Sequence, residues 1–234
     1  MPISPYLAMT AAEISLCSPL PEKIAWMACH FSPGGDGLSN CPRELPPGSL
    51  LILDDSIPPE GQDPDRVAGE LLELAETLRC DGILLDLQRQ EAQLIPALCR
   101  KLSGNTPCPV AVSCRYASFW DGPLFLPPLP LHVSPKKALS PWRGRELWLE
   151  LSREDHCLAL TKDGCRPVLP AQAPGGPFPH RCESLFCSYR VDIAPEAAVF
   201  SLHRNGDDQT ALLAEAEAYG VTRAVGLYQE FRTA

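Results

Sequence analysis

The sequence is short of basic charge and has no long hydrophobic run. Its 234 residues include 20 Lys and Arg against 29 Asp and Glu, which gives a net charge of −9. Because nucleic acids and anionic membranes are bound by basic surfaces, we expect neither as a partner. No segment approaches the roughly 18 apolar residues of a membrane span, and the N-terminus has no basic segment followed by an apolar one. We therefore expect a cytoplasmic protein without a secretory signal.

The sequence also lacks the residue spacings of a metal site. None of its 11 cysteines forms a CxxC pair, although Cys182 and Cys187 come close, and neither HxH nor HExxH occurs. Zinc ligands usually come in pairs about two to four residues apart. We therefore predict no metal and no other cofactor. Since nothing indicates export, we expect reduced, partly buried thiols rather than disulfides.

The composition that remains is typical of a globular α/β protein. Hydrophobic residues make up 45% of the chain, and its 26 prolines fall mostly between the apolar segments. The spacing of apolar residues predicts helices over 63–79, 90–103 and 207–220, with Asp63 and Asp207 as N-caps of the first and the last. Short apolar runs predict strands over 24–31, 49–56, 82–88, 109–117, 129–134, 145–152, 197–204 and 222–231.

Strands that alternate with helices pair in parallel, either in an open doubly wound sheet or in a (β/α)8 barrel. The first strand is not followed by the G-x-G-x-x-G phosphate turn, which excludes the usual nucleotide-binding open sheet. We predict a single TIM-like (β/α)8 barrel domain over 1–234 with an incomplete helix layer. The segment 152–196 shows little helical periodicity and contains a turn at Lys162-Asp163-Gly164. We expect a small antiparallel or loop insertion there.

The strand at 82–88, GILLDLQ, ends in polar residues. Side chains of a barrel strand alternate between the lumen and the helix layer, and the helix-facing set must be apolar. Asp86 and Gln88 therefore face the lumen at the C-terminal end of the strand, where barrel enzymes hold their chemistry. A purely structural role for Asp86, at a strand end, is the alternative.

The same sorting brings further side chains to the mouth of the barrel. Glu150 and Glu230 are additional candidates for catalytic carboxylates. The candidates for ligand contact are Asp54, Asp55, Arg115, Trp148, His203 and Tyr228. Carboxylates beside flat aromatic faces suit a small polar ligand, and a saccharide in particular. Structural alternatives are solvated surface acids, an Asx-type turn, core aromatics and a loop histidine.

The segment DGILLDLQ (81–88) resembles the fourth-strand signature of the chitinase-like glycoside hydrolases, D-G-x-D-x-D-x-E. Asp81, Gly82 and Asp86 match that signature, whereas Leu84 replaces its inner aspartate and Gln88 its general-acid glutamate. The resemblance implies a (β/α)8 fold with a sugar-shaped pocket. It also implies loss of the family's acid, because a glutamine amide cannot protonate a leaving oxygen. In the strands counted above, this strand is the third and not the fourth.

The leading hypothesis is a glycosidase-like barrel that binds a carbohydrate or a similar polar ligand without catalysis of the family type. One alternative is an active glycoside hydrolase whose acid is Glu150 or Glu230. Another is a metal-dependent hydrolase that uses His30, His203 and the aspartates. The last is a non-catalytic structural or partner-binding protein. Whether the chain is an enzyme, which ligand it binds and its oligomeric state stay open at this level.

Overall fold

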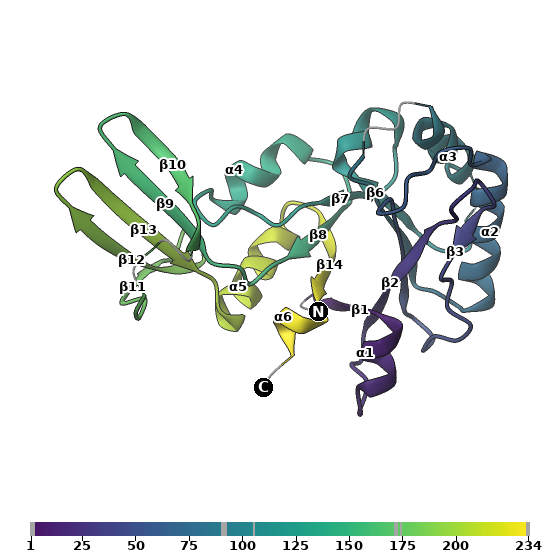
Figure 1. The fold of residues 1–234 in the computed structure, drawn as a ribbon, viewed down its shortest axis with the longest axis horizontal. Coiled ribbons are helices and arrows are strands. Elements are labelled where there is room, and N and C mark those ends of the chain that lie inside the picture. Colours follow the sequence, from purple (N-terminus) through teal and green to yellow (C-terminus); the bar gives the residue numbers. More distant parts are fainter. Residues whose placement is uncertain (1–2, 90–92, 105, 171–172, 174, 233–234) are drawn as a thin grey trace. The chain divides into compact units, whose positions relative to one another are not determined.

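The computed structural model describes residues 3–89, 93–104, 106–170, 173 and 175–232 (Figure 1). The chain forms two compact units. The barrel unit comprises Ser4–Pro127, Gly144–Glu150 and Val221–Ala234, and the insertion unit comprises Met1–Ile3, Pro128–Arg143 and Leu151–Gly220. None of the helices in the described ranges is long and apolar enough to cross a membrane.

The barrel unit contains a closed sheet of eight parallel strands, as the sequence predicted. In chain order they are β1 (Tyr6–Met9), β2 (Ile24–Phe31), β4 (Leu50–Asp54), β5 (Gly82–Asp86), β6 (Val110–Ser113), β7 (Leu124–Leu126), β8 (Leu147–Leu151) and β14 (Val221–Leu227). The sheet closes because β1 pairs in parallel with both β2 and β14. A short strand, β3 (Leu38–Ser39), pairs antiparallel with the end of β2.

The structure corrects the strand predictions at several points. Strand β1 was missed, so β5 is the fourth strand of the barrel and not the third. The predicted strand at 129–134 does not form; the three-residue strand β7 precedes it, and Pro130 lacks the N–H that a central strand would need. The predicted barrel strand at 197–204 is β13 (Ala197–His203), and it belongs to the antiparallel sheet of the insertion unit.

The helix layer of the barrel is incomplete, as predicted. Its helices are α1 (Ala11–Leu16), α2 (Pro64–Thr77), α3 (Leu94–Leu102) and α6 (Tyr228–Phe231), and a 3-10 helix, η1 (Cys114–Phe119), follows β6. Helix α2 begins as the sequence indicates: the Asp63 side chain accepts the N–H of Asp65, and Pro64 occupies the first helical position. Helix α3 starts four residues later than predicted, and 90–92 lie outside the described residues.

All eight parallel strands contribute side chains to one buried cluster in the lumen of the barrel. The buried cluster consists of Tyr6, Ala8, Ala25, Leu50, Ile52, Leu84, Ala111, Phe125, Trp148 and Val225. Trp148 is fully buried, and Gly82 makes room for it: a Cβ at Gly82 would lie 2.5 Å from the Cη2 atom of the indole. Leu84, on the same face of β5, confirms the predicted inward phase of that strand.

The insertion unit is built on an antiparallel sheet in the order β10-β9-β13-β12-β11 (Figure 1, green). Its other strands are β9 (His156–Thr161), β10 (Gly164–Val168), β11 (His180–Cys182) and β12 (Cys187–Ala194), and its helices are α4 (Pro135–Leu139), η2 (Ser140–Trp142) and α5 (Gly206–Glu217). The predicted turn joins β9 to β10, where Thr161 pairs with Gly164. The N-cap of α5 is Asn205 and not Asp207, because Asn205 and Asp208 form a reciprocal capping box.

Candidate functional site

Three carboxylates surround a small cavity inside the mouth of the barrel. Asp54 ends β4, Asp86 ends β5 and Glu150 lies near the end of β8, so all three come from C-terminal strand ends. The cavity has a volume of about 80 Å³. Its remaining lining is mostly apolar and consists of Ala8, Met27, Ile52, Leu84, Phe125, Val225, Gly226 and Leu227. Strand alternation in the sequence predicted Asp86 and Glu150 at the mouth, and Asp54 only as one of the pair Asp54 and Asp55.

Asp86 and Gln88 form a hydrogen-bonded pair at this mouth. The Nε2 atom of Gln88 donates to Oδ1 of Asp86 over 2.6 Å, and the Gln88 side chain is exposed. Burial raises the pKa of the Asp86 carboxyl, and the nearby charges of Asp54 and Asp55 raise it further, whereas hydrogen bonds from Gln88 and Ser113 oppose the shift. Asp86 therefore holds a proton at higher pH than an ordinary aspartate.

Asp54 is paired with a histidine from the neighbouring strand. His30 on β2 lies opposite Asp54 in the sheet register, and its Nδ1 is 2.8 Å from Oδ1 of Asp54. The Ser56 N–H donates to the same Oδ1, and the Ser56 hydroxyl is 3.1 Å from the His30 ring nitrogen. The sequence suggested His30 as a metal ligand or a core histidine, but not as a partner of Asp54. His30 and Asp54 occupy equivalent positions near the ends of two adjacent strands. This equivalence could have indicated the pair from the sequence.

Asp55 and Arg115 hold the backbone of Gln88 rather than lining the cavity. The buried Asp55 carboxylate accepts the N–H of Gln88 over 2.9 Å and the N–H of Arg89 over 2.6 Å. The Arg89 guanidinium in turn donates to the Asp55 carbonyl oxygen over 2.7 Å. Arg115, on η1, donates to the Gln88 carbonyl oxygen. These contacts fix the backbone of Gln88, and therefore the position from which its side chain extends.

The last strand has the opposite phase to the predicted one. β14 ends at Leu227, and Val225 and Leu227 face the lumen where Tyr228 and Glu230 were expected. Both expected residues lie on α6, and the Tyr228 hydroxyl donates to the Cys17 sulfur over 3.4 Å. The strand at 222–231 was predicted too long. Its central residues, Ala224, Val225 and Gly226, are small or apolar on both faces, so alternation could not set the phase.

Two further candidates are not among the residues that line the cavity. Trp148 is fully buried and fills the barrel core beside Gly82. His203 belongs to the insertion unit, where its Nδ1 is 2.7 Å from Asp155 and its ring stacks on Phe178 at a centroid distance of 5.1 Å. Among the residues that the structure describes, no group of three or more His, Cys, Asp or Glu side chains is arranged to hold a metal ion.

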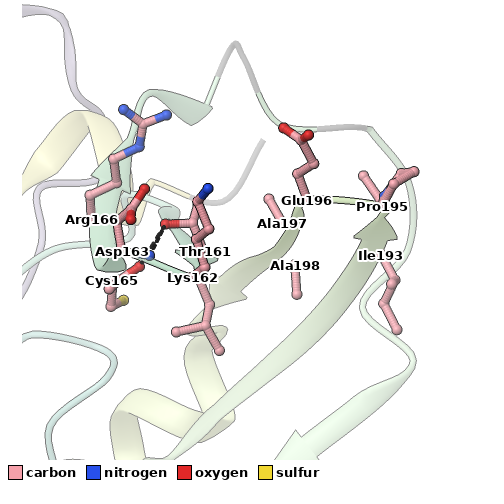
Figure 2. A pocket seen from close by; sticks show the side chains of 13 residues that line it. Thr161, Lys162, Asp163, Cys165, Arg166, Ile193, Pro195, Glu196, Ala197 and Ala198 are labelled. Atoms are coloured by element: carbon pink, nitrogen blue, oxygen red, sulfur yellow. Dashed lines mark hydrogen bonds between the residues drawn. The ribbon is translucent and has the colours of Figure 1, made fainter.

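A second, wider hollow lies in the insertion unit. It has a volume of about 860 Å³ and lies between the β9–β10 turn and the β12–β13 turn (Figure 2). The charged residues around it are Lys162, Asp163, Arg166 and Glu196, and the exposed apolar residues are Leu160 and Ile193. This hollow is open and its charges are mixed in sign. It contains none of the residues that the sequence analysis selected.

Comparison with solved structures finds proteins of similar fold. The spore cortex-lytic enzyme SleL of Bacillus cereus superposes with a TM-score of 0.53 at 8% identity, over 96% of this chain and 70% of that one. A putative sporulation-specific glycosylase of Bacillus subtilis gives 0.49 at 10% identity (86% and 90%), and a chitinase of Chromobacterium violaceum gives 0.44 at 10% identity (95% and 93%). No family model and no curated protein sequence matches the chain.

The fold is therefore a closed parallel α/β barrel with an antiparallel insertion, as the sequence predicted, and it is similar to the fold of SleL. The particular structure that supports this conclusion is SleL. Because its sequence is only 8% identical, the similarity concerns the fold alone. The position of β5 as the fourth strand removes the one mismatch in strand count between this chain and the family signature.

Proposed function

We propose that the protein is a glycoside-hydrolase-like barrel that binds a polar ligand, preferably a saccharide, and that it lacks the acid catalysis of the chitinase-like family. The observation that carries the proposal is the Gln88 amide at the mouth of the fourth strand, hydrogen-bonded to Asp86. An amide can orient a ligand or a carboxylate but cannot transfer a proton to a leaving oxygen. The pocket thus keeps polar recognition while the proton donor of the family is absent from its usual place.

The size of the cavity limits how a ligand would bind. A volume of about 80 Å³ is far below the roughly 300 Å³ of a common ligand pocket. It accommodates a few water molecules or one small substituent of a larger ligand. We infer that a saccharide would lie across the mouth and insert one polar substituent between Asp54, Asp86 and Glu150. Phe125 and Met27 would supply the apolar wall of that subsite.

The test combines turnover with direct binding. A fluorogenic chitobioside should not be hydrolysed at a useful rate by the wild-type protein. Isothermal titration with chitooligosaccharides should give binding that Asp86→Ala weakens about tenfold or more, because a buried polar contact is lost. Glu73→Ala, which removes an exposed carboxylate on α2, is the matched control and should bind normally. Clear turnover that is abolished by Asp86→Ala would refute the proposal.

One observation favours a second candidate, an active hydrolase that uses other carboxylates. Asp86 and Glu150 line the same cavity, and the pKa of Asp86 is raised by burial, which is the property of a general acid. In that case Asp86→Asn and Glu150→Gln should each reduce kcat by at least about 100-fold while the protein stays folded. If only binding changes in both variants, the non-catalytic proposal stands.

A further inference from the structure

Two cysteines are brought together by the hairpin between β2 and β3. Cys29 lies on β2 and is fully buried, whereas Cys41 follows β3 and is exposed. Their sulfur atoms are 3.7 Å apart. The antiparallel register of His30 with Ser39 sets this approach, and the Trp26 indole N–H holds the intervening Asn40 by donating to its carbonyl oxygen over 3.2 Å. The contact therefore results from the local fold of the hairpin.

The two thiols differ in burial and in pKa, as a nucleophilic cysteine and its partner thiol do. The hydrogen bond between them lowers the pKa of Cys41 and raises that of Cys29, and burial raises the pKa of Cys29 further. A hydrogen bond from the Cys29 thiol to the sulfur of Cys41 favours a thiolate at the exposed position. An exposed thiolate beside a second thiol is the arrangement of a reversibly oxidised cysteine pair.

We propose that Cys29 and Cys41 form a reversible disulfide when the protein meets a hydroperoxide. The Cys41 thiolate attacks one peroxide oxygen, the O–O bond breaks, and the departing oxygen takes up a proton, which leaves Cys41 as a sulfenic acid. The Cys29 sulfur then attacks the Cys41 sulfur, the S–O bond breaks, and water leaves with the Cys29 proton. The two thiols lose two electrons in total and the hydroperoxide gains them.

Metal binding is the other chemistry open to paired thiols. The two sulfurs are not part of a set of three or more ligating side chains among the residues that the structure describes, and soft metals in structural sites are held by about four ligands. Disulfide formation has a direct structural consequence, because it closes the short segment between β2 and the residue after β3. Strand β2 also carries His30, the neighbour of Cys29 and the partner of Asp54.

The test uses a favourable feature of the sequence. Trypsin releases 24–43 as one peptide that contains Cys29 and Cys41 and no other cysteine. After brief treatment with hydrogen peroxide and alkylation under denaturing conditions, this peptide should be two hydrogens lighter and unalkylated, and dithiothreitol should reverse the change. The oxidised protein should melt roughly 5–10 °C higher than the reduced protein, because the cross-link restricts the unfolded chain.

Variants separate the two roles. In Cys29→Ala, a sulfenic-acid probe should label Cys41, because the resolving thiol is gone. In Cys41→Ser, an exposed and conservative change, Cys29 should stay alkylatable after peroxide. Cys165, an exposed cysteine of the insertion unit, serves as the reactivity control, and Cys165→Ser should leave the 24–43 disulfide intact. Should Cys29→Ala fail to fold, the wild-type and Cys41→Ser peptides still decide. A wild-type peptide that stays doubly alkylated, or that is oxidised only to sulfinic acid, would overturn the proposal.

Discussion

The two ends of the barrel lumen use polar residues in different ways. At the N-terminal end, Arg223 pairs with Asp81 over 3.1 Å and its guanidinium lies 4.6 Å from the centroid of the Trp148 ring. The Tyr6 hydroxyl also donates to Asp81, and the Trp148 indole N–H donates to Glu146 over 3.3 Å. These groups satisfy one another beneath a filled core. They form a closed, structural end of the barrel.

At the mouth, the acids border a cavity instead. Asp86 has a neutral amide as its side-chain partner, and Asp54 has a histidine. The segment that resembles the family signature runs the length of the lumen: Asp81 and Gly82 belong to the closed end, and Asp86 and Gln88 to the mouth. The difference indicates that the first half of the signature, Asp81 and Gly82, serves packing. A barrel can therefore retain these residues while the residues of the second half, at the mouth, are replaced.

The largest expected effect comes from removing the side chain that fills the closed end. Trp148→Ala should lower the free energy of unfolding by about 3–5 kcal/mol, because it leaves a cavity among fully buried neighbours. Urea denaturation followed by circular dichroism measures this change. Phe125→Leu, at the cavity wall near the mouth, should cost about 1 kcal/mol. Equal losses in the two variants would contradict the division of the lumen into a closed end and a mouth.

A smaller loss is expected from the glycine that accommodates the indole. Gly82→Ala should cost about 1–3 kcal/mol, because the new Cβ would lie 2.5 Å from Trp148 and within 3.2 Å of two other atoms. In a Trp148→Phe background the clash with the far edge of the indole is gone, so the same change should cost less. A double-mutant cycle that shows no coupling between the two positions would refute this explanation of the glycine.

The sequence predicted the barrel and the inward phase of β5 and β8, because those strands carry a polar residue among leucines. It did not reveal β1 or β7, since strands of four and three residues are too short to show alternation. The phase of β14 was predicted wrongly because Ala224, Val225 and Gly226 are small or apolar on both faces.

For the site, the sequence selected Asp86 and Gln88 directly, whereas it could not separate Asp54 from Asp55. Their roles depend on contacts with residues distant in the chain. Asp54 meets His30 across a strand pair, and Asp55 binds the backbone after β5, more than 30 residues away. Such contacts become visible only when the neighbouring strands are known.

A moderate and pH-dependent effect is expected from Tyr6 at the closed end. Burial first, and the neighbouring Asp81 second, raise the pKa of Tyr6 from 10.0 to about 12. The unfolded chain therefore loses the Tyr6 proton at lower pH than the folded chain, so the stabilisation is complete below pH 10 and is lost as the pH rises toward 12. Tyr6→Phe should cost about 1 kcal/mol at neutral pH and should remove this part of the alkaline decline in urea midpoints.

The smallest change in stability, and the most informative for function, is expected from Gln88→Glu. The two side chains have nearly the same shape and Gln88 is exposed, so the variant should be within about 0.5 kcal/mol of wild type at low pH. The new carboxyl lies where the amide contacts Asp86, and neighbouring carboxylates resist double ionisation. Both folded-state pKa values should therefore lie above their unfolded values, so the stability of the variant relative to wild type should fall as the pH rises through them. Urea midpoints measured between pH 4 and 8 test this sign, with Gln88→Asn as the neutral control.

A weak glycosidase activity that appears in Gln88→Glu and disappears in Asp86→Asn/Gln88→Glu would show that the mouth still has the geometry of a hydrolase site. A variant whose stability follows that of wild type at every pH would show that the two carboxyls do not meet there.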